Sequence, residues 1–251
     1  MANYDFVNAQ GLANRELPGA QANNTLQPVR TSRYMETYSQ LMGGSKLAAL
    51  SEEGSYFTAT NATQGTPISG TAAPTAFSAT VALMSLYNTA VQGASGAKNI
   101  ILDYIQLEVR AAGTNGTNFL YAMSLDAGNR FSSGGTAITP TNSNMGLTTA
   151  TGATLNVGAL TATAASSGVR RPKAGQVRSV IKVVGDVYLF LFGQSTASFA
   201  GMPLEGTLQA MIPIHCPPVT LGPNTTFLLH EVAASQSVAA TYEFSMGWWE
   251  K

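Results

Sequence analysis

The sequence predicts a mainly β protein, with a predominantly antiparallel sandwich of two sheets over residues 55–251 and an N-terminal arm over residues 1–54. Three observations lead to this fold class. Several runs alternate apolar and polar residues, which is the two-residue period of a half-buried strand. Thr, Ser, Gly and Pro separate these runs, as they do in turns between short strands. The first 54 residues show no such alternation, so we expect the arm to contain only one or two short helices.

Residues 1 to about 32 mix Asn, Gln, Ala, Gly and Pro without a sustained hydrophobic period. Such a segment cannot bury enough apolar surface to fold alone. Its isolated large side chains are spaced like anchors along an extended strip: Tyr4, Phe6, Leu12, Leu17 and Leu26. An extended chain covers up to ~3.3 Å per residue, so this arm is long enough to cross an adjacent subunit. We therefore interpret it as an interface segment that becomes ordered on assembly.

One short helix, and a second of one or two turns, are expected in the last part of the arm, between residues 32 and 54. The stretch "SRYMETYSQLM" places Tyr34, Tyr38 and Leu41 at helical spacing. The stretch "GSKLAALSEEG" offers Ser45 as a helix N-cap and Gly54 as a stop. We expect no further helix beyond residue 54.

The clearest strands are predicted in the middle of the chain. In "IILDYIQLEVRAAG", apolar residues at 105, 107 and 109 alternate with polar residues at 106, 108 and 110. A second run alternates from Phe119 to Leu125. Asn115 and Gly116 lie between the two runs and tolerate the positive φ angles of a tight turn, so the pattern predicts a β-hairpin.

Residues 131–168 are almost uncharged and of low complexity. Leu155, Val157 and Ala159 predict one half-exposed strand inside this stretch. The remainder is expected to form a long surface loop. Long loops without structure of their own are uncommon unless they are functional or disordered, so this loop either lies passively on the surface or contacts a neighbouring subunit or a ligand.

The last third of the chain is again predicted to be β. "RSVIKVVGDVYLFLFGQ" is nearly continuously apolar, as in a strand buried on both faces, and "MIPIHC" and "TFLLHEVA" give two more strands around Pro217 and Pro218. The tail "AATYEFSMGWWEK" alternates, which puts Trp248 on the core face and Trp249 on the opposite face. We predict that this tail is an interior strand. Trp249 is then either an interface anchor or a ring lying flat over its own sheet.

The charge content predicts association. The chain has 13 basic and 13 acidic residues, so its net charge is zero and its charged fraction is 10%. An ordinary globular protein has about 25% charged residues. Weakly charged surfaces near zero net charge tend to associate, so we expect a homo-oligomer. A neutral balance also gives no general attraction for nucleic acid or acidic lipid.

The chemistry-bearing residues are few, and we predict no catalytic residue, metal site or cofactor, hence no enzyme. His215 and His230 would face each other only if their strands pair, and a third ligand is missing. There is no G-x-S-x-G motif around a serine nucleophile. The single cysteine, Cys216, excludes an internal disulfide framework. A paired-carboxylate hydrolase site remains open, since strand pairing could bring together some of Asp103, Glu108, Asp126 and Asp186.

One basic cluster lies in "GVRRPKAGQVRSVIK", and its members are Arg170, Arg171, Lys173, Arg178 and Lys182. A patch for single-stranded nucleic acid would interleave aromatic residues among these charges, and none is present. We therefore favour a basic loop that matches an acidic patch on a partner subunit. No apolar run reaches the ~18 residues of a membrane span, and the N-terminus lacks the pattern of a secretory signal.

Two stretches, "LGPNTTFLLHEVAASQS" and "ATYEFSMGWWEK", resemble the C-terminus of small structural proteins of tailed bacteriophage virions. The resemblance covers about the last 30 residues, and in the rest of the chain only the general composition is similar. It implies a β-sandwich or jelly roll, often trimeric, after an arm that grips a neighbour. No catalytic residue comes with it. The absence of a long amphipathic helix after the arm departs from main shell proteins and favours an accessory role.

The expected function is therefore that of a non-enzymatic capsid decoration or cement protein, or another accessory virion protein. It would assemble in the host cytoplasm through self-association and through contacts with neighbours such as the main capsid protein. The alternative is a host-surface binding protein of the vertex or tail that recognises a glycan or receptor. A polysaccharide-depolymerising enzyme ranks lower, because the carboxylates are scattered.

Overall fold

The computed structural model describes residues 46–70, 76–114, 116–179, 181–193, 211–234 and 236–251. These residues form fourteen strands and one helix, α2 (Lys46–Glu52), so the prediction of a mainly β protein is confirmed. Leu47–Lys251 make up one compact unit. The arm anchors Tyr4, Phe6, Leu12, Leu17 and Leu26, and the expected helix at 32–42, lie outside the described residues.

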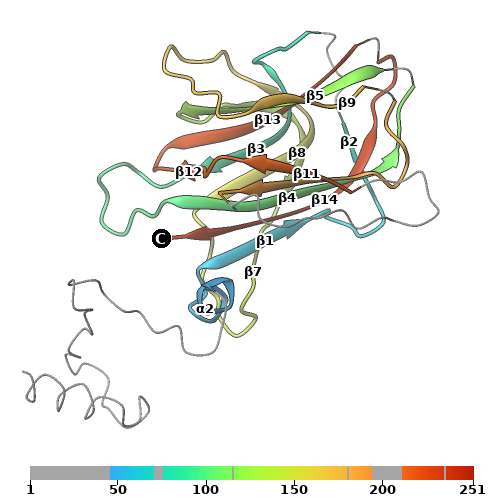
Figure 1. Ribbon diagram of the computed structural model, residues 1–251. Helices are drawn as coiled ribbons and strands as arrows, with labels where there is room; N and C mark the ends of the chain where they lie inside the picture. Colours follow the sequence, from blue (N-terminus) through green and yellow to red (C-terminus); the bar gives the residue numbers. More distant parts are fainter. Residues whose placement is uncertain (1–45, 71–75, 115, 180, 194–210, 235) are drawn as a thin grey trace, which may run out of the picture. The chain divides into compact units, whose positions relative to one another are not determined.

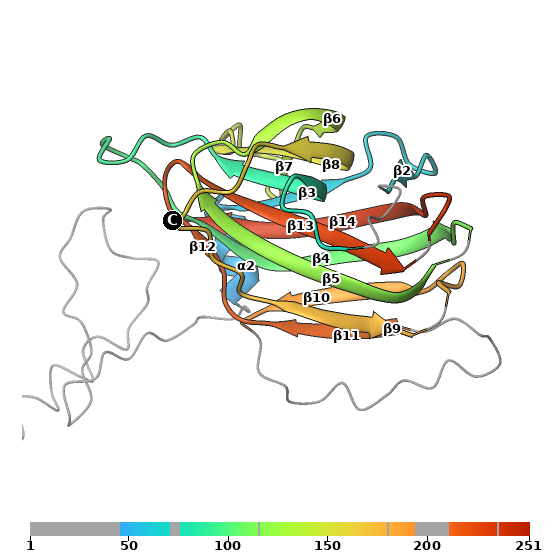
Figure 2. The same ribbon diagram turned by 90° about the horizontal axis from the view of Figure 1, so that it is seen from above.

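The strands form two sheets that face each other (Figures 1 and 2). All pairings are antiparallel except that of β10 with β11. The first sheet has the order β11 (Met211–Cys216), β10 (Val187–Phe192), β4 (Ile100–Ala111), β14 (Thr241–Glu250), β1 (Tyr56–Thr60) and β7 (Thr141–Asn142), with β12 (Thr220–Leu221) beside β4 and β2 (Ile68–Ser69) beside β14. The second has the order β6 (Phe131–Ile138), β8 (Ala153–Ala162), β3 (Val81–Asn88), β13 (Thr225–Ala234), β5 (Thr117–Ala127) and β9 (Ala174–Arg178).

The core lies between the sheets and follows the predicted alternation. From the first sheet, Leu107 and Phe190 are fully buried; from the second, Met123 and Phe227 meet them in one apolar cluster. Along β4 the intervening residues Gln106 and Glu108 are half-buried on the outer face. The burial of each inward row is the main stabilising term, at about 25 cal/mol per Å² of apolar surface.

The C-terminal tail is an interior strand, as predicted. β14 pairs with β4 on one side and with β1 on the other. Trp248 is fully buried and stacks on Phe57, with ring centroids 6.3 Å apart. Trp249 lies on the opposite face, half-buried and opposite Tyr56. Gly247 is required before this pair, since a Cβ there would stand 2.2 Å from the Tyr56 hydroxyl.

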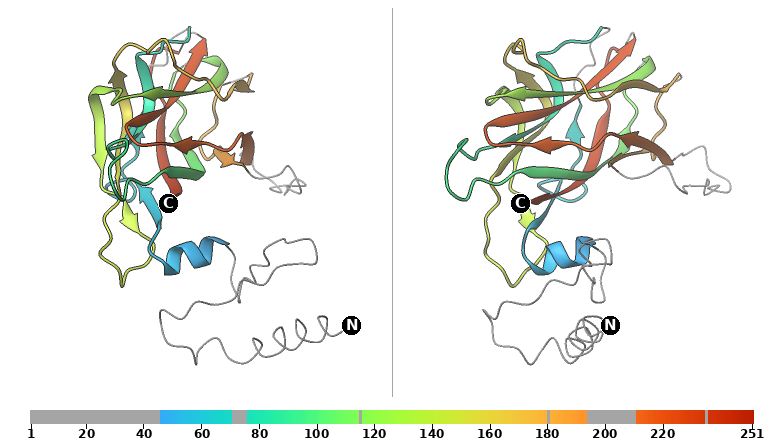
Figure 3. Two further views of the ribbon diagram at one scale, coloured as in Figure 1. Left: turned by 90° about the vertical axis from the view of Figure 1, so that its left-hand side faces the viewer. Right: turned by 60° about the vertical axis from the view of Figure 1, so that its left-hand side comes forward.

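Helix α2 adjoins the first sheet through the loop after β7, as Figure 3 also shows. Gly54 ends it with a φ of 70°, which confirms the predicted stop. The side-chain amide of Asn142 donates to the Gly54 carbonyl oxygen (2.8 Å), and that of Asn144 donates to the Glu52 carbonyl oxygen (3.1 Å). These bonds satisfy carbonyls that a helix end leaves without partners.

The predicted hairpin around Gly116 is wrong. β4, which ends at Ala111, belongs to the first sheet, and β5, which begins at Thr117, belongs to the second. Each strand pairs instead with a C-terminal strand, β4 with β14 and β5 with β13. Antiparallel pairing with distant strands outweighs the local turn signal here because it buries both runs against the opposite sheet.

The prediction of a long loop over residues 131–168 is also wrong in part. The stretch contains β6, β7 and β8, and only the strand at Leu155 and Val157 was expected. The sequence pattern does not predict β6, because six consecutive residues of this strand, Ser132–Ala137, are exposed and small. Gly134 and Gly135 have φ angles of 81° and 64°, and the pairing of β6 with β8 shifts register beside them. They form a bulge that bends this edge strand.

Candidate functional site

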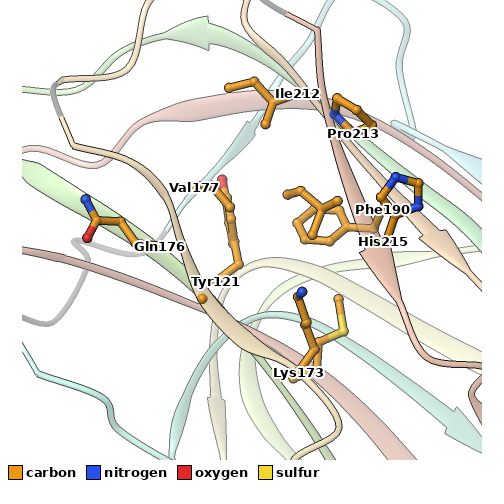
Figure 4. Close-up of a pocket in the computed structure, with 11 residues that line it drawn as sticks. Tyr121, Lys173, Gln176, Val177, Phe190, Ile212, Pro213 and His215 are labelled. Atoms are coloured by element: carbon orange, nitrogen blue, oxygen red, sulfur yellow. The ribbon is translucent and has the colours of Figure 1, made fainter. Parts of the chain in front are cut away.

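An open cleft lies along one side of the sandwich, between the edge strands of the two sheets. Figure 2 shows β9 and β11 along this side. The cleft has a volume of about 330 Å³. Lys173 and Gln176 line it from the β9 side, and Ile212 and His215 from β11, with the Phe190 ring between them (Figure 4).

This cleft offers an apolar floor with a polar rim. Phe190 and Val177 provide apolar contact area, while Lys173 provides a positive charge and Gln176 an amide. Nδ1 of His215 is buried and has no hydrogen-bond partner among the described residues. Such a lining suits a small ligand with one apolar face and polar or anionic substituents.

Lys173 also acts on the nearby thiol of Cys216. Burial raises the pKa of Cys216 to about 11, and the positive charge of Lys173 opposes this rise only in part. The thiol therefore stays protonated at neutral pH, and a thiolate nucleophile is not available here.

Arg170 and Arg171 of the predicted basic loop are exposed at the surface. The backbone of Arg170 exchanges two hydrogen bonds of 2.8 Å with Leu125, which extends the edge of the second sheet beyond β9. The exposed Arg171 guanidinium lies 5.2 Å from the centre of the Phe77 ring. Lys173 is half-buried at the cleft. Arg170, Arg171 and Lys173 thus lie near one edge of the second sheet, whereas Trp249 lies on β14 of the first sheet. Their role at an interface stays a prediction.

Lys182 departs from that prediction, because it is one of the most deeply buried side chains of the sandwich, with 1% of its surface exposed. The apolar run that suggested a strand from residue 178 onward is interrupted here, and β10 begins only at Val187. Lys182 Nζ contacts a carboxylate oxygen of Glu231 on β13 and the hydroxyl of Tyr242 on β14. The ammonium lies 3.9 Å from the centre of the Phe119 ring.

This cluster bridges the two sheets and is fully enclosed. The Tyr242 hydroxyl donates to Oε1 of Glu231 at 2.8 Å, and the Tyr121 hydroxyl donates to that of Tyr242 at 3.4 Å. Burial lowers the pKa of Lys182 well below its usual value, although the charge of Asp186 acts to raise it. Burial also raises the pKa of Tyr242 well above the usual value. A signal for this site existed in the sequence: a single Lys within the apolar run "VIKVVG".

The two histidines lie in different sheets, so the pairing that could have joined them does not occur. His215 is on β11 and His230 on β13. Nε2 of His230 lies 2.7 Å from Ser124 Oγ, and Nδ1 lies 2.7 Å from the carbonyl oxygen of Val81. Within the described residues no three His, Cys, Asp or Glu side chains are close enough to hold a metal ion.

The carboxylates that could have formed a paired site are instead engaged separately. Asp103 accepts a hydrogen bond from the Tyr56 hydroxyl (2.8 Å). Asp126 forms an ion pair with the buried Arg130 and accepts bonds from Ser166. Burial acts to raise the pKa of Asp126, but the bonds from Ser166 and Arg130 outweigh it and the pKa is lowered. Asp186 accepts a bond from the Val183 amide (3.0 Å). Glu108 forms an ion pair with Arg110 on the same strand (2.9 Å), so each of the four carboxylates has different partners.

No protein-family model matches this chain, and the searches of curated proteins and of solved structures find no match. None of the described helices is long and apolar enough to cross a membrane.

Proposed function

We propose that this chain is a non-enzymatic structural protein of a tailed-phage virion, most simply a capsid decoration or cement protein. It acts by associating with copies of itself, as a trimer, and through contacts of its N-terminal arm with neighbours such as the main capsid protein. Its place of action is the virion, which assembles in the host cytoplasm. The observation that carries the proposal is the distribution of charge between the interior and the surface.

The chain is weakly charged, and seven charged side chains among its described residues are buried: Asp103, Asp126, Arg130, Lys182, Asp186, Glu231 and Glu250. Buried charges are rare because their desolvation is costly unless they are paired. The outer surface is correspondingly depleted of the charges that keep soluble proteins apart. The edge strand β6 illustrates this, since its six exposed residues carry no charge. Natural edge strands usually carry charges that prevent pairing with another chain, so this edge is suited to contact with a copy.

A jelly-roll relationship and a gripping arm are the finer parts of the proposal. Eight strands, β1, β3, β4, β5, β8, β10, β13 and β14, can be numbered first to eighth along the chain. The first sheet then contains the order first, eighth, third, sixth, which is that of a jelly roll. The second sheet keeps second, seventh, fourth, but the fifth strand, β8, pairs with β3 and not with β5. This departure makes the sandwich jelly-roll-like.

Light scattering coupled to size-exclusion chromatography tests the self-association. We expect the full-length chain to form an oligomer, and Thr136→Lys on β6 to shift it toward the monomer. Thr220→Lys provides the matched control, because Thr220 is exposed on the other sheet. A chain that stays monomeric at all concentrations contradicts the proposal, as does its absence from an electron-microscopy map of intact particles.

The cleft between β9 and β11 favours a second function, a host-surface binding protein for a glycan or receptor. Its aromatic floor and polar rim are of the kind that binds small polar ligands. Copy number distinguishes the two functions: a lattice-wide distribution on the capsid supports cement, and a few copies at a vertex or tail support adhesion. Binding to a glycan array that is lost in Lys173→Ala, but kept in the exposed control Lys98→Ala, would favour adhesion.

A further inference from the structure

Lys182 is buried although lysine side chains are ordinarily exposed to solvent. Its neighbours Ile181 and Val184 are 42% and 51% exposed, whereas Lys182 itself is 1% exposed. The loop before β10 therefore turns apolar groups toward solvent and an amine toward the core. Around the amine lie the rings of Phe119, Tyr242 and Tyr121, with centroids at 3.9, 4.9 and 5.7 Å from Nζ. Such an arrangement opposes the hydrophobic effect, so it requires a specific compensating interaction.

The compensating group is the carboxyl of Glu231, which Lys182 Nζ contacts directly. Glu231 is 1% exposed, and its Oε2 accepts no hydrogen bond from the described residues. A carboxylate left with one oxygen unsatisfied in an apolar interior is costly. The cost falls when the proton moves from the amine to the carboxyl, which leaves both groups neutral. Burial also favours the neutral form of the amine, since it lowers the pKa of Lys182.

A neutral amine held against a protonated carboxyl in a dry site is a nucleophile in contact with its electrophile. We propose that Lys182 and Glu231 condense to an intramolecular isopeptide bond. The lone pair of Nζ attacks Cδ of the Glu231 carboxyl, and a C–N bond forms. The C–O bond to the protonated oxygen breaks, and that oxygen leaves as water with a proton lost from the amine. The product is an uncharged amide, and the reaction needs no oxidant, reductant or metal.

Tyr242 is positioned to relay the proton. Its hydroxyl contacts both Lys182 Nζ and Oε1 of Glu231, so it can accept a proton from the amine and donate one to the carboxyl. The high pKa of Tyr242 keeps the hydroxyl protonated between these steps. Its role is that of a proton relay within the cluster.

The bond would link the two sheets covalently. Lys182 precedes β10 of the first sheet, and Glu231 lies on β13 of the second, 49 positions along the chain. Most other contacts between the two sheets across the core are apolar and non-covalent. A covalent link resists separation of the sheets under mechanical or chemical stress. This inference does not depend on the proposed role in the virion.

Intact mass spectrometry of the full-length protein under denaturing conditions tests the bond. We expect a mass lower by one water molecule than the sequence requires. Cyanogen bromide cleaves after each Met, and it would release fragments 146–202 and 212–246, which contain Lys182 and Glu231 respectively. With the bond present, these two fragments remain joined in one species.

The variants Lys182→Leu and Glu231→Ala should have their full sequence masses and yield the two fragments separately. Lys173→Leu is the matched control, because this lysine lies at the cleft and within the same fragment, and it should retain the loss of water. A wild-type protein at its full sequence mass overturns the proposal, and this result does not depend on the folding of any variant. A loss of water that persists in Lys182→Leu equally overturns it, since the water then comes from another site.

Discussion

Replacing each of the two adjacent tryptophans by alanine should have very different effects on folding. Trp248 is fully buried, stacks on Phe57 and belongs to the main apolar cluster. Removing a buried Trp side chain costs about 3–5 kcal/mol of unfolding free energy. For a domain of this size, each kcal/mol lowers Tm by about 2–4 °C, so Trp248→Ala should lower Tm by about 6–20 °C.

Trp249 is the internal control, since it is the next residue on the same strand. It lies half-buried on the outer face, where its cross-strand neighbour is Tyr56. A cross-strand pair of this kind contributes about 0.2–1 kcal/mol, so Trp249→Ala should lower Tm by about 4 °C at most. If Trp249 is also an interface anchor, the same variant should weaken self-association at low concentration.

Thermal unfolding followed by circular dichroism measures both variants, and light scattering measures their association. Equal decreases in Tm would refute the assignment of the two rings to opposite faces. A large decrease for Trp249→Ala alone would show that the outer face, and not the core, holds the tail.

Three further predictions concern His230, Cys216 and the arm. Burial lowers the pKa of His230, with the charges of Arg130 and Arg171 acting in the same direction and the bond to the Val81 carbonyl opposing them. The unfolded chain therefore binds the proton more tightly, so the free energy of unfolding should fall as the pH decreases from about 7 through the unfolded pKa near 6.5. Urea denaturation of the wild type and of His230→Gln at several pH values checks this prediction. An equal pH dependence of the two proteins contradicts it. The Cys216 thiol, with a pKa of about 11, should resist iodoacetamide at pH 8 until the protein is unfolded, and rapid labelling of the native protein would count against its burial. Deletion of residues 1–32 should leave the thermal transition nearly unchanged but abolish incorporation into particles, and full occupancy by the truncated protein would mean that the arm is passive.

The sequence alone determines which residues face the core within a strand. The alternation in β4 and β14 predicts the buried rows that contain Leu107 and Trp248, because side chains alternate between the two faces whatever strand lies alongside. It also determines the end of α2 at Gly54, since this stop depends on local backbone conformation. These features need no knowledge of distant residues.

The partner of each strand was decided only by the tertiary structure. Two alternating runs around Gly116 have the same pattern whether the chain folds back as a hairpin or crosses to the other sheet. β6 carries small exposed residues on an edge, so no apolar period indicates it. Pairing depends on which strands bury most apolar surface together, which is a property of the whole chain.

The buried cluster shows the same limit most clearly. Composition and spacing place Lys182 in a basic surface loop, because a lysine ordinarily prefers water. Its contacts, Glu231 and Tyr242, lie 49 and 60 positions away in sequence and on different sheets. Only the packing of the two sheets brings them to the amine, and burial inside that packing then changes its charge preference. The sequence supplied the reactive groups, and the tertiary structure decided that they meet without water.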